Sequence, residues 1–259
     1  MAALVLLSTA AGMYGLTTAE DLTVDPATVT LTGLRYTDPA TALAVMGLTD
    51  SMPNLVRLRT TDLAASLRSL PAVREAMVEA ELPDVLRVTV VEREPIMAWR
   101  YPVALRLIDV EGVDMAPATG QEGLPLIDDR RTGSTPVLPG AAIAALDLGV
   151  ARLLGSIEPS DLGSSAASLS LSVTDADGWV VSTDAWLARF GHYTPTLRPP
   201  SSIAMQVACL KGILGQAGEE AISAVTLSLS ADGCGTYQPV PRPTVAPTVS
   251  PGPPRSPRG

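Results

Sequence analysis

The sequence predicts an α+β fold, in which a hydrophobic N-terminal anchor precedes a small strand-helix-helix-strand-strand domain and a mixed or antiparallel β domain with two helices. Three observations lead to this prediction. Residues 1–16 form an apolar run without any charge. In residues 22–94 the spacing of apolar residues alternates between strand and helix periodicity, whereas residues 95–237 contain mainly short alternating strands. Residues 238–259 are rich in proline and are expected to form a disordered tail.

The N-terminal run reads MAALVLLSTAAGMYGL. A helix that spans a bilayer needs roughly 17–25 mostly apolar residues, so this segment is short by about one turn. It also lacks the basic residues that open a secretion signal. We favour a shortened membrane anchor, with a degenerate secretion signal and a buried first helix as alternatives.

The order of elements in the small domain follows from local patterns. Valine and leucine alternate with threonine in residues 29–32, which is typical of a strand. A helix is expected from Pro39, because proline is favoured in the first turn. A second helix is expected through Leu63, Leu67 and Leu70, whose spacing places them on one face. Two alternating stretches joined by a Leu-Pro-Asp turn predict a closing hairpin.

Several local sequences resemble one known family. They are VTLTGLRYTD at residues 29–38, the stretch from NLVRLRTTDL to VVEREP at residues 54–95, and ALRLIDVEGV at residues 104–113. The most specific is E-R-x-P at residues 92–95, which leads into a strand that contains Ala98 and Trp99. Together they resemble the POTRA domain, and the strands after it, of the FtsQ/DivIB family of bacterial cell division proteins. The resemblance covers about residues 21–237.

This resemblance implies a scaffold without enzymatic activity. In that family the POTRA domain lies near the membrane, and a second, β domain holds the small coiled-coil proteins FtsB and FtsL. The expected partners are therefore FtsB/FtsL-like division proteins, and the expected role is to help regulate septal wall synthesis. The resemblance also implies a single-pass protein of the cytoplasmic membrane with most of its chain outside the cytoplasm. It implies no cofactor, nucleic acid or small-molecule substrate.

The candidate docking site is the last predicted strand. In it, Val225, Leu227 and Leu229 would face the core, while Thr226, Ser228 and Ser230 would face the other side. No later strand is predicted, so its outer edge would offer unpaired backbone groups to a partner strand. The resemblance adds Tyr237, just beyond this strand. The predicted partner-binding residues are Val225, Thr226, Leu227, Ser228, Leu229, Ser230 and Tyr237. In the alternative interpretation the strand is internal, covered by the Trp186–Phe190 strand or by the loop to Tyr237.

Composition excludes several other functions. The net charge is −9 and the pI about 4.6, which does not favour binding to a phosphate backbone. One histidine and two cysteines are too few for the common zinc sites. We expect Cys209 in a buried helix and unpaired with Cys234, with a disulfide as the alternative in an oxidising compartment. We expect the three tryptophans in the core rather than in a ligand groove: Trp99, Trp179 and Trp186.

Catalytic motifs are also lacking. His192 has Ser182 and Asp184 upstream, but no G-x-S-x-G turn accompanies them, so we expect a surface imidazole. The acidic pairs Asp128–Asp129 and Asp175/Asp177 are expected to be solvated turn formers rather than a glycosidase pair. Two other functions are alternatives. A secretion or outer-membrane assembly component with a POTRA domain would need a long run of barrel strands, and a secreted hydrolase would need a pocket with converging polar residues.

Overall fold

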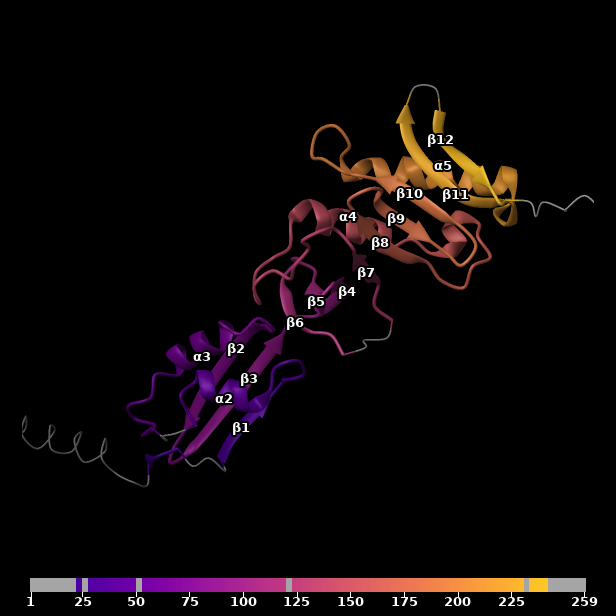
Figure 1. The fold of residues 1–259 in the computed structure, drawn as a ribbon. Helices are drawn as coiled ribbons and strands as arrows, with labels where there is room; N and C mark the ends of the chain where they lie inside the picture. The colour runs from indigo at the N-terminus through magenta and orange to yellow at the C-terminus, as the bar shows by residue number, and fades with distance from the viewer. Residues whose placement is uncertain (1–21, 25–27, 50–52, 120–122, 231–232, 242–259) are drawn as a thin grey trace, which may run out of the picture.

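The computed structural model describes residues 22–24, 28–49, 53–119, 123–230 and 233–241, without the side chains of Leu229 and Ser230. Two sheets lie one after the other along an elongated molecule (Figure 1). The predicted anchor at residues 1–16 lies outside the described residues. None of the helices in the described ranges has the length and apolar composition needed to cross a bilayer.

The first sheet has three strands in the order β1-β3-β2, with two helices packed on one face. Asp38 caps the first helix by accepting the N–H of Thr41, and Pro39 fills its first turn. Leu67 on the second helix is fully buried against the sheet. The element order strand-helix-helix-strand-strand is as predicted: β1 (Val29–Thr32), α2 (Pro39–Val45), α3 (Thr60–Arg68), β2 (Val73–Glu81) and β3 (Val85–Glu92).

The second sheet has nine strands in the order β12-β11-β10-β9-β8-β7-β4-β5-β6. It is mixed, because β4–β7, β7–β8 and β10–β11 pair in parallel and the other neighbours pair antiparallel. Its elements are β4 (Pro95–Tyr101), β5 (Ala104–Asp109), β6 (Asp114–Pro117), β7 (Leu126–Asp129), α4 (Ala145–Gly155), β8 (Ser170–Thr174), β9 (Gly178–Ser182), β10 (Leu187–Gly191), α5 (Ile203–Ala217), β11 (Ile222–Ser230) and β12 (Gly233–Pro239). Short 3-10 turns lie at Pro159–Leu162, Pro200–Ser202 and Glu219–Ala221.

One continuous core joins this sheet to α4 and α5. Val150 and Leu154 of α4, and Leu210 and Leu214 of α5, are buried in it. All three tryptophans are also buried there, as predicted, with at most 3% of any of them exposed. The prediction of two helices after residue 95 is confirmed. The strands β6, β7 and β12 were not predicted, because each is short, polar or rich in glycine and proline.

The E-R-x-P motif connects the two sheets. The Glu92 carboxylate accepts the backbone N–H groups of Arg35, Tyr36 and Thr37 at 2.7, 2.7 and 2.8 Å. It thereby fixes the loop after β1 to the end of β3. The next residue, Arg93, pairs with Asp109 at 2.6 Å on the second sheet. Because adjacent residues bind the two sheets in turn, this motif positions one sheet relative to the other. A small apolar cluster at the same junction comprises Ala72, Leu107, Met115 and Ala116.

Candidate docking site

The predicted docking strand, β11, is internal. It pairs in parallel with β10, where Ala188 faces Val225, and antiparallel with β12, where Tyr237 faces Val225. The prediction that its outer edge is free is therefore wrong, and the alternative of an internal strand holds. The physical reason is that residues 233–239 turn back along β11. The predicted tail also started too early, since Gln238 and Pro239 belong to β12.

The orientation predicted for β11 agrees with the structure where its side chains are described. Val225 and Leu227 are buried in the core, at 0% and 2% exposure. Thr226 is exposed and Ser228 is half-buried. The predictions for the side chains of Leu229 and Ser230 fall outside the described residues. The two-residue period therefore identified the buried face of this strand correctly.

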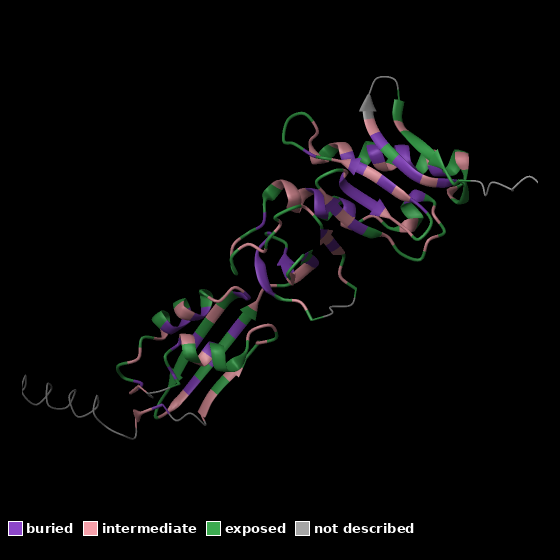
Figure 2. Ribbon diagram, in the orientation of Figure 1, coloured by how far each residue is buried: buried purple, intermediate pink, exposed green. Residues whose placement is uncertain are grey.

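The structure moves the open edge to β12. Among the described residues, β12 pairs with β11 alone. Figure 2 shows it as an exposed strand beside the largely buried β11. Tyr237 is 51% exposed on this strand, and its neighbours Thr236 and Gln238 are also exposed. A strand at this position can accept a further strand through its unpaired backbone groups.

A disulfide attaches this edge strand to α5. Cys209 of α5 bonds to Cys234 of β12, with 5.9 Å between their Cα atoms. The favoured interpretation of two separate cysteines was thus wrong, because it depended on treating the segment around Cys234 as a loop. Next to the bridge, a Cβ on Gly235 would lie 3.0 Å from the Thr226 carbonyl oxygen and 3.2 Å from Ile213. Gly235 therefore lets β12 lie close against both β11 and α5.

Arg198 supports β11 from the other side. Its Nη2 donates to the Leu227 carbonyl oxygen at 3.0 Å, beyond the last residue that β10 pairs with β11. Its guanidinium lies 5.7 Å from the ring centre of Tyr193. The Tyr193 hydroxyl donates to Gln206 on α5 at 2.6 Å, and burial raises the pKa of this tyrosine. The 192–200 loop therefore completes the pairing of β11 and joins it to α5.

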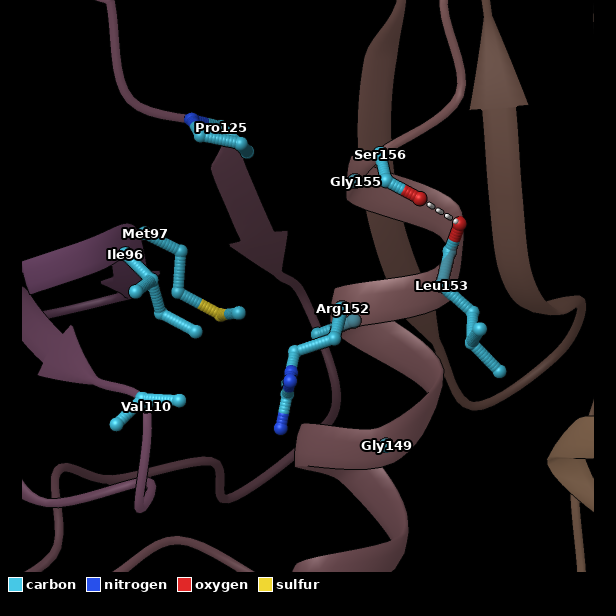
Figure 3. Close-up of a pocket in the computed structure, with 10 residues that line it drawn as sticks. Ile96, Met97, Val110, Pro125, Gly149, Arg152, Leu153, Gly155 and Ser156 are labelled. Atoms are coloured by element: carbon cyan, nitrogen blue, oxygen red, sulfur yellow. Dashed lines mark hydrogen bonds between the residues drawn. The ribbon is translucent and has the colours of Figure 1, made fainter.

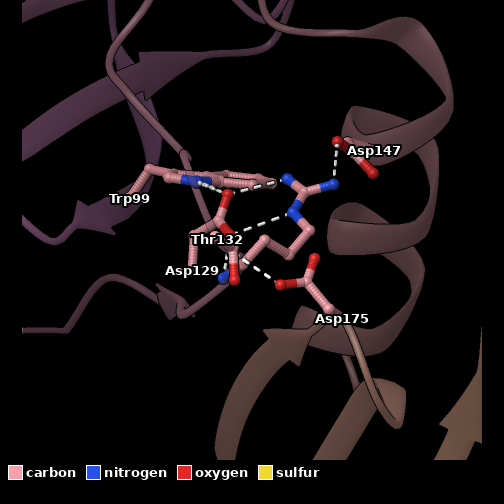
Figure 4. Close-up of polar contacts among 6 residues, drawn as sticks. Trp99, Asp129, Thr132, Asp147 and Asp175 are labelled. Carbon is pink, nitrogen blue, oxygen red and sulfur yellow. Dashed lines mark hydrogen bonds and ion pairs between the residues drawn. The ribbon is translucent and has the colours of Figure 1, made fainter.

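A second polar cluster lies at the start of α4. Arg131 bonds both Asp129, at 2.7 Å, and Asp147 of α4, at 2.9 Å (Figure 4). Trp99 donates its indole N–H to Asp129 at 3.2 Å. Asp129 is only 2% exposed, so its prediction as a solvated turn former is wrong. Burial raises the pKa of Asp129, but the hydrogen bonds from Arg131 and Ser134, with the charge of Arg131, together outweigh burial and the net pKa is lowered.

This cluster is organised as an ion-pair network. Asp175 is exposed and accepts the backbone N–H of Thr132 at 2.6 Å, which lowers its pKa. Asp177 pairs with Arg189 at 2.8 Å. His192 is exposed as predicted, and its Nε2 lies 3.0 Å from the Asp175 carbonyl oxygen rather than beside a serine hydroxyl. Within the described residues no three His, Cys, Asp or Glu side chains are grouped to hold a metal ion.

Comparison with known proteins agrees with this fold. The model of the FtsQ-type POTRA domain matches residues 25–93. The chain is thus similar to members of the FtsQ/DivIB family. It is 41% identical over 81 residues to the cell division protein FtsQ of Mycobacteroides abscessus, which is 30% of this chain and 26% of that protein. It is 30% identical over 132 residues to FtsQ of Corynebacterium glutamicum, covering 50% of this chain and 59% of that protein.

A third FtsQ relative, from Chloroflexus aurantiacus, is 34% identical over 102 residues, or 38% of this chain and 36% of that protein. The matches thus span about a quarter to three fifths of the length of these three FtsQ proteins. The small sheet with α2 and α3 corresponds to the matched POTRA domain. Within the described residues, the open edge of β12 lies at the end of the large sheet farthest from that domain (Figure 1).

Proposed function

We propose that this chain is a scaffold of the bacterial cell division machinery that holds FtsB/FtsL-like partners and helps regulate septal wall synthesis without catalysing a reaction. The single observation that carries the proposal is the open edge of β12. The names of the relatives support the cell division role. In this proposal residues 22–94 and 95–237 act as separate domains. The first domain lies near the membrane, and the second offers the edge of β12 to a strand of the partner.

The binding mode would be addition of an extended partner segment to β12. Val240 donates its N–H to the Ala221 carbonyl oxygen on the β11 side. Backbone N–H groups alternate in direction along a strand, so we expect those of Gln238 and Thr236 to point toward β11. The N–H of Tyr237 would then point to the open side. The originally predicted residues of β11 would support this edge from within the sheet, while Tyr237 would contact the partner directly.

Proline substitution can distinguish an N–H group that points toward β11 from one that points to the open side, because proline removes one backbone donor. Tyr237→Pro should abolish partner binding and leave the melting temperature nearly unchanged. Tyr237→Ala is the matched control, since it removes the same side chain and keeps the N–H. Thr236→Pro should instead destabilise the protein, because it removes a donor to β11. Binding is measured by co-purification with FtsB/FtsL-like proteins of the same organism. Normal binding by a folded Tyr237→Pro variant would refute strand addition at β12.

The proposal also places most of the chain outside the cytoplasm, tethered through the apolar residues 1–16 to the cytoplasmic membrane. The Cys209–Cys234 disulfide supports this location, since disulfides persist in oxidising compartments. The test is to trap thiols in intact cells with a maleimide of high molecular mass before lysis. We expect no labelling unless a reductant is added first. Labelling of both cysteines without reductant would contradict the proposed location.

A further inference from the structure

A groove of about 720 Å³ lies between α4 and the start of β4 (Figure 3). One side is formed by Ile96 and Met97 of β4 and by Val110, which follows β5. Pro125 lies at one end. The groove is near the β4-β5-β6 end of the large sheet, so it is well separated in the strand order from the edge of β12. None of the contacts that hold β12 involves it.

The opposite wall is one face of α4. Gly149, Arg152, Leu153 and Ser156 follow the spacing i, i+3, i+4 and i+7, which places them together on the helix surface. Leu153 is 44% exposed, and Val110 across the groove is 48% exposed. Leu153 and Val110 therefore present large apolar side chains to solvent, and Figure 3 shows Leu153 pointing away from the β4 wall. Exposed apolar surfaces of this kind are typical of binding sites.

The groove also has a charge of its own. Arg152 is the single charged residue among those lining it, and it forms no ion pair with any described side chain. Figure 3 shows its guanidinium extending into the space between the two walls. Arg131, by contrast, is held between Asp129 and Asp147. In a chain of net charge −9, an unpaired arginine in an apolar groove favours a ligand that is both apolar and acidic.

We propose that this groove docks an amphipathic α-helix of a partner protein, with aliphatic side chains between the walls and a carboxylate on Arg152. The inference rests on the scaffold function proposed above and adds a second docking surface to it. The α4 wall runs over two helical turns, or about 10 Å, which suits a helix packed alongside.

Other occupants fit less well. An extended strand has no edge to join here, because β4 already pairs with β5 and β7. The Pro-rich segment at residues 238–259 carries three arginines and no acidic residue, so it does not complement Arg152. A lipid or fatty acid would satisfy the same apolar and acidic chemistry. The experiment must therefore separate a partner helix from an acyl chain.

Photo-crosslinking in cells makes this distinction on the full chain. A photoreactive phenylalanine analogue replaces Val110 or Leu153, one on each wall, and Leu138, which is 80% exposed and outside the groove, is the control position. We expect both groove positions to crosslink one protein segment with apolar residues three and four apart and at least one acid. The proposal would be overturned if the groove positions crosslinked only to lipid or to an extended protein segment. It would also be overturned if the control position crosslinked to the same segment as the groove positions.

Charge reversal then tests the role of Arg152. Arg152→Glu should weaken binding of the purified crosslinked partner about tenfold or more, and exchanging the partner's acid for arginine should restore it. Arg68→Glu is the matched control, because Arg68 is an exposed arginine on α3. Equal effects of the two substitutions, or no rescue, would refute the acidic contact. Tyr237→Pro should leave the groove crosslinks intact, so failure at β12 and failure at the groove are distinguishable.

Discussion

The two edge strands of the nine-stranded sheet, β6 and β12, differ in how their outer backbone groups are paired. At the β6 end, Gly140 donates to the Asp114 carbonyl oxygen at 2.9 Å, and Asp114 donates to the Ala141 carbonyl oxygen at 3.0 Å. A loop therefore covers that edge, and the apolar cluster with Ala72 packs it against the POTRA domain. At the other end, β12 pairs with β11 only, within the described residues, and most of its side chains are exposed.

This difference indicates a division of labour within one sheet. At the β6 end, both backbone groups of Asp114 bond to the loop at residues 140–141, and its side chain forms a buried ion pair with Arg106. At the β12 end no further strand pairs with β12 within the described residues, and a disulfide to α5 attaches it in addition to its pairing with β11. An unpaired edge invites pairing with another chain, so an edge kept open but fixed in place suits a docking strand.

The largest effect is expected at the β6 end, which we call the closed end because a loop covers its edge. Asp114 is 0% exposed and binds Arg106 through both carboxylate oxygens, at 2.7 and 3.0 Å. Asp114→Ala leaves Arg106 with an uncompensated, largely buried charge, and should reduce the free energy of unfolding by about 3–5 kcal/mol. Glu81→Ala, which breaks an exposed pair with Arg87, should cost under about 1 kcal/mol. Urea denaturation measures both, and similar losses would contradict the difference in burial.

At the β12 end, which we call the open end, loss of the disulfide should reduce the free energy of unfolding by a somewhat smaller amount. Cys209 and Cys234 are 25 residues apart, and replacing both with serine should cost about 2–4 kcal/mol. The loss should be local, so hydrogen exchange of the β12 amides should accelerate while that of β6 stays unchanged. Dithiothreitol should reproduce the effect in the wild-type protein and leave the double variant unaffected. Faster exchange at both ends would mean that the disulfide stabilises the whole sheet.

At the junction beside the closed end, the Glu92 carboxylate accepts three backbone N–H groups. Glu92→Gln keeps the shape but removes the charge and one acceptor oxygen, so it should cost about 1–2 kcal/mol. Glu94→Gln, two residues away, is the control. Spin labels on α3 and α4 should report a broader distance distribution in Glu92→Gln only. An unchanged distribution would show that the motif stabilises the loop without fixing the two sheets relative to each other.

The sequence predicted the small domain beside the β6 end better than either edge strand of the large sheet, since it missed both β6 and β12. The hairpin before the E-R-x-P motif and the helix through Leu67 have strong periodicity that tertiary contacts only reinforce. In β12 the sequence GCGTYQP has no apolar alternation, and its strand conformation comes from pairing with β11 and from the bridge to Cys209. The prediction that Asp129 is a solvated turn former was wrong for a similar reason. Its burial depends on Arg131 and on Trp99, which comes from a different strand.

The smallest effect is expected from a carboxylate that holds the start of β11. Glu219 accepts the Ser164 hydroxyl at 2.6 Å, the Ser165 N–H at 2.9 Å and the Ser165 hydroxyl. These bonds, that from the Ser164 hydroxyl first, lower the pKa of Glu219 from 4.5 to about 2. A lowered folded-state pKa stabilises the protein above the unfolded value. That contribution is therefore complete above pH 4.5 and is lost as the pH falls toward about 2.

Glu219→Gln should remove this part of the acid sensitivity, because glutamine does not titrate. Glu220→Gln is the matched control, since Glu220 is the exposed neighbour in the same short turn. Melting temperatures are compared across the interval between pH 4.5 and 2. Other carboxylates with lowered pKa, such as Asp129 and Asp175, titrate in both variants, so the difference between the two curves isolates Glu219. We expect the Glu219→Gln curve to fall less steeply than the control. Parallel curves would show that the serine bonds to Glu219 do not stabilise the open end of the sheet.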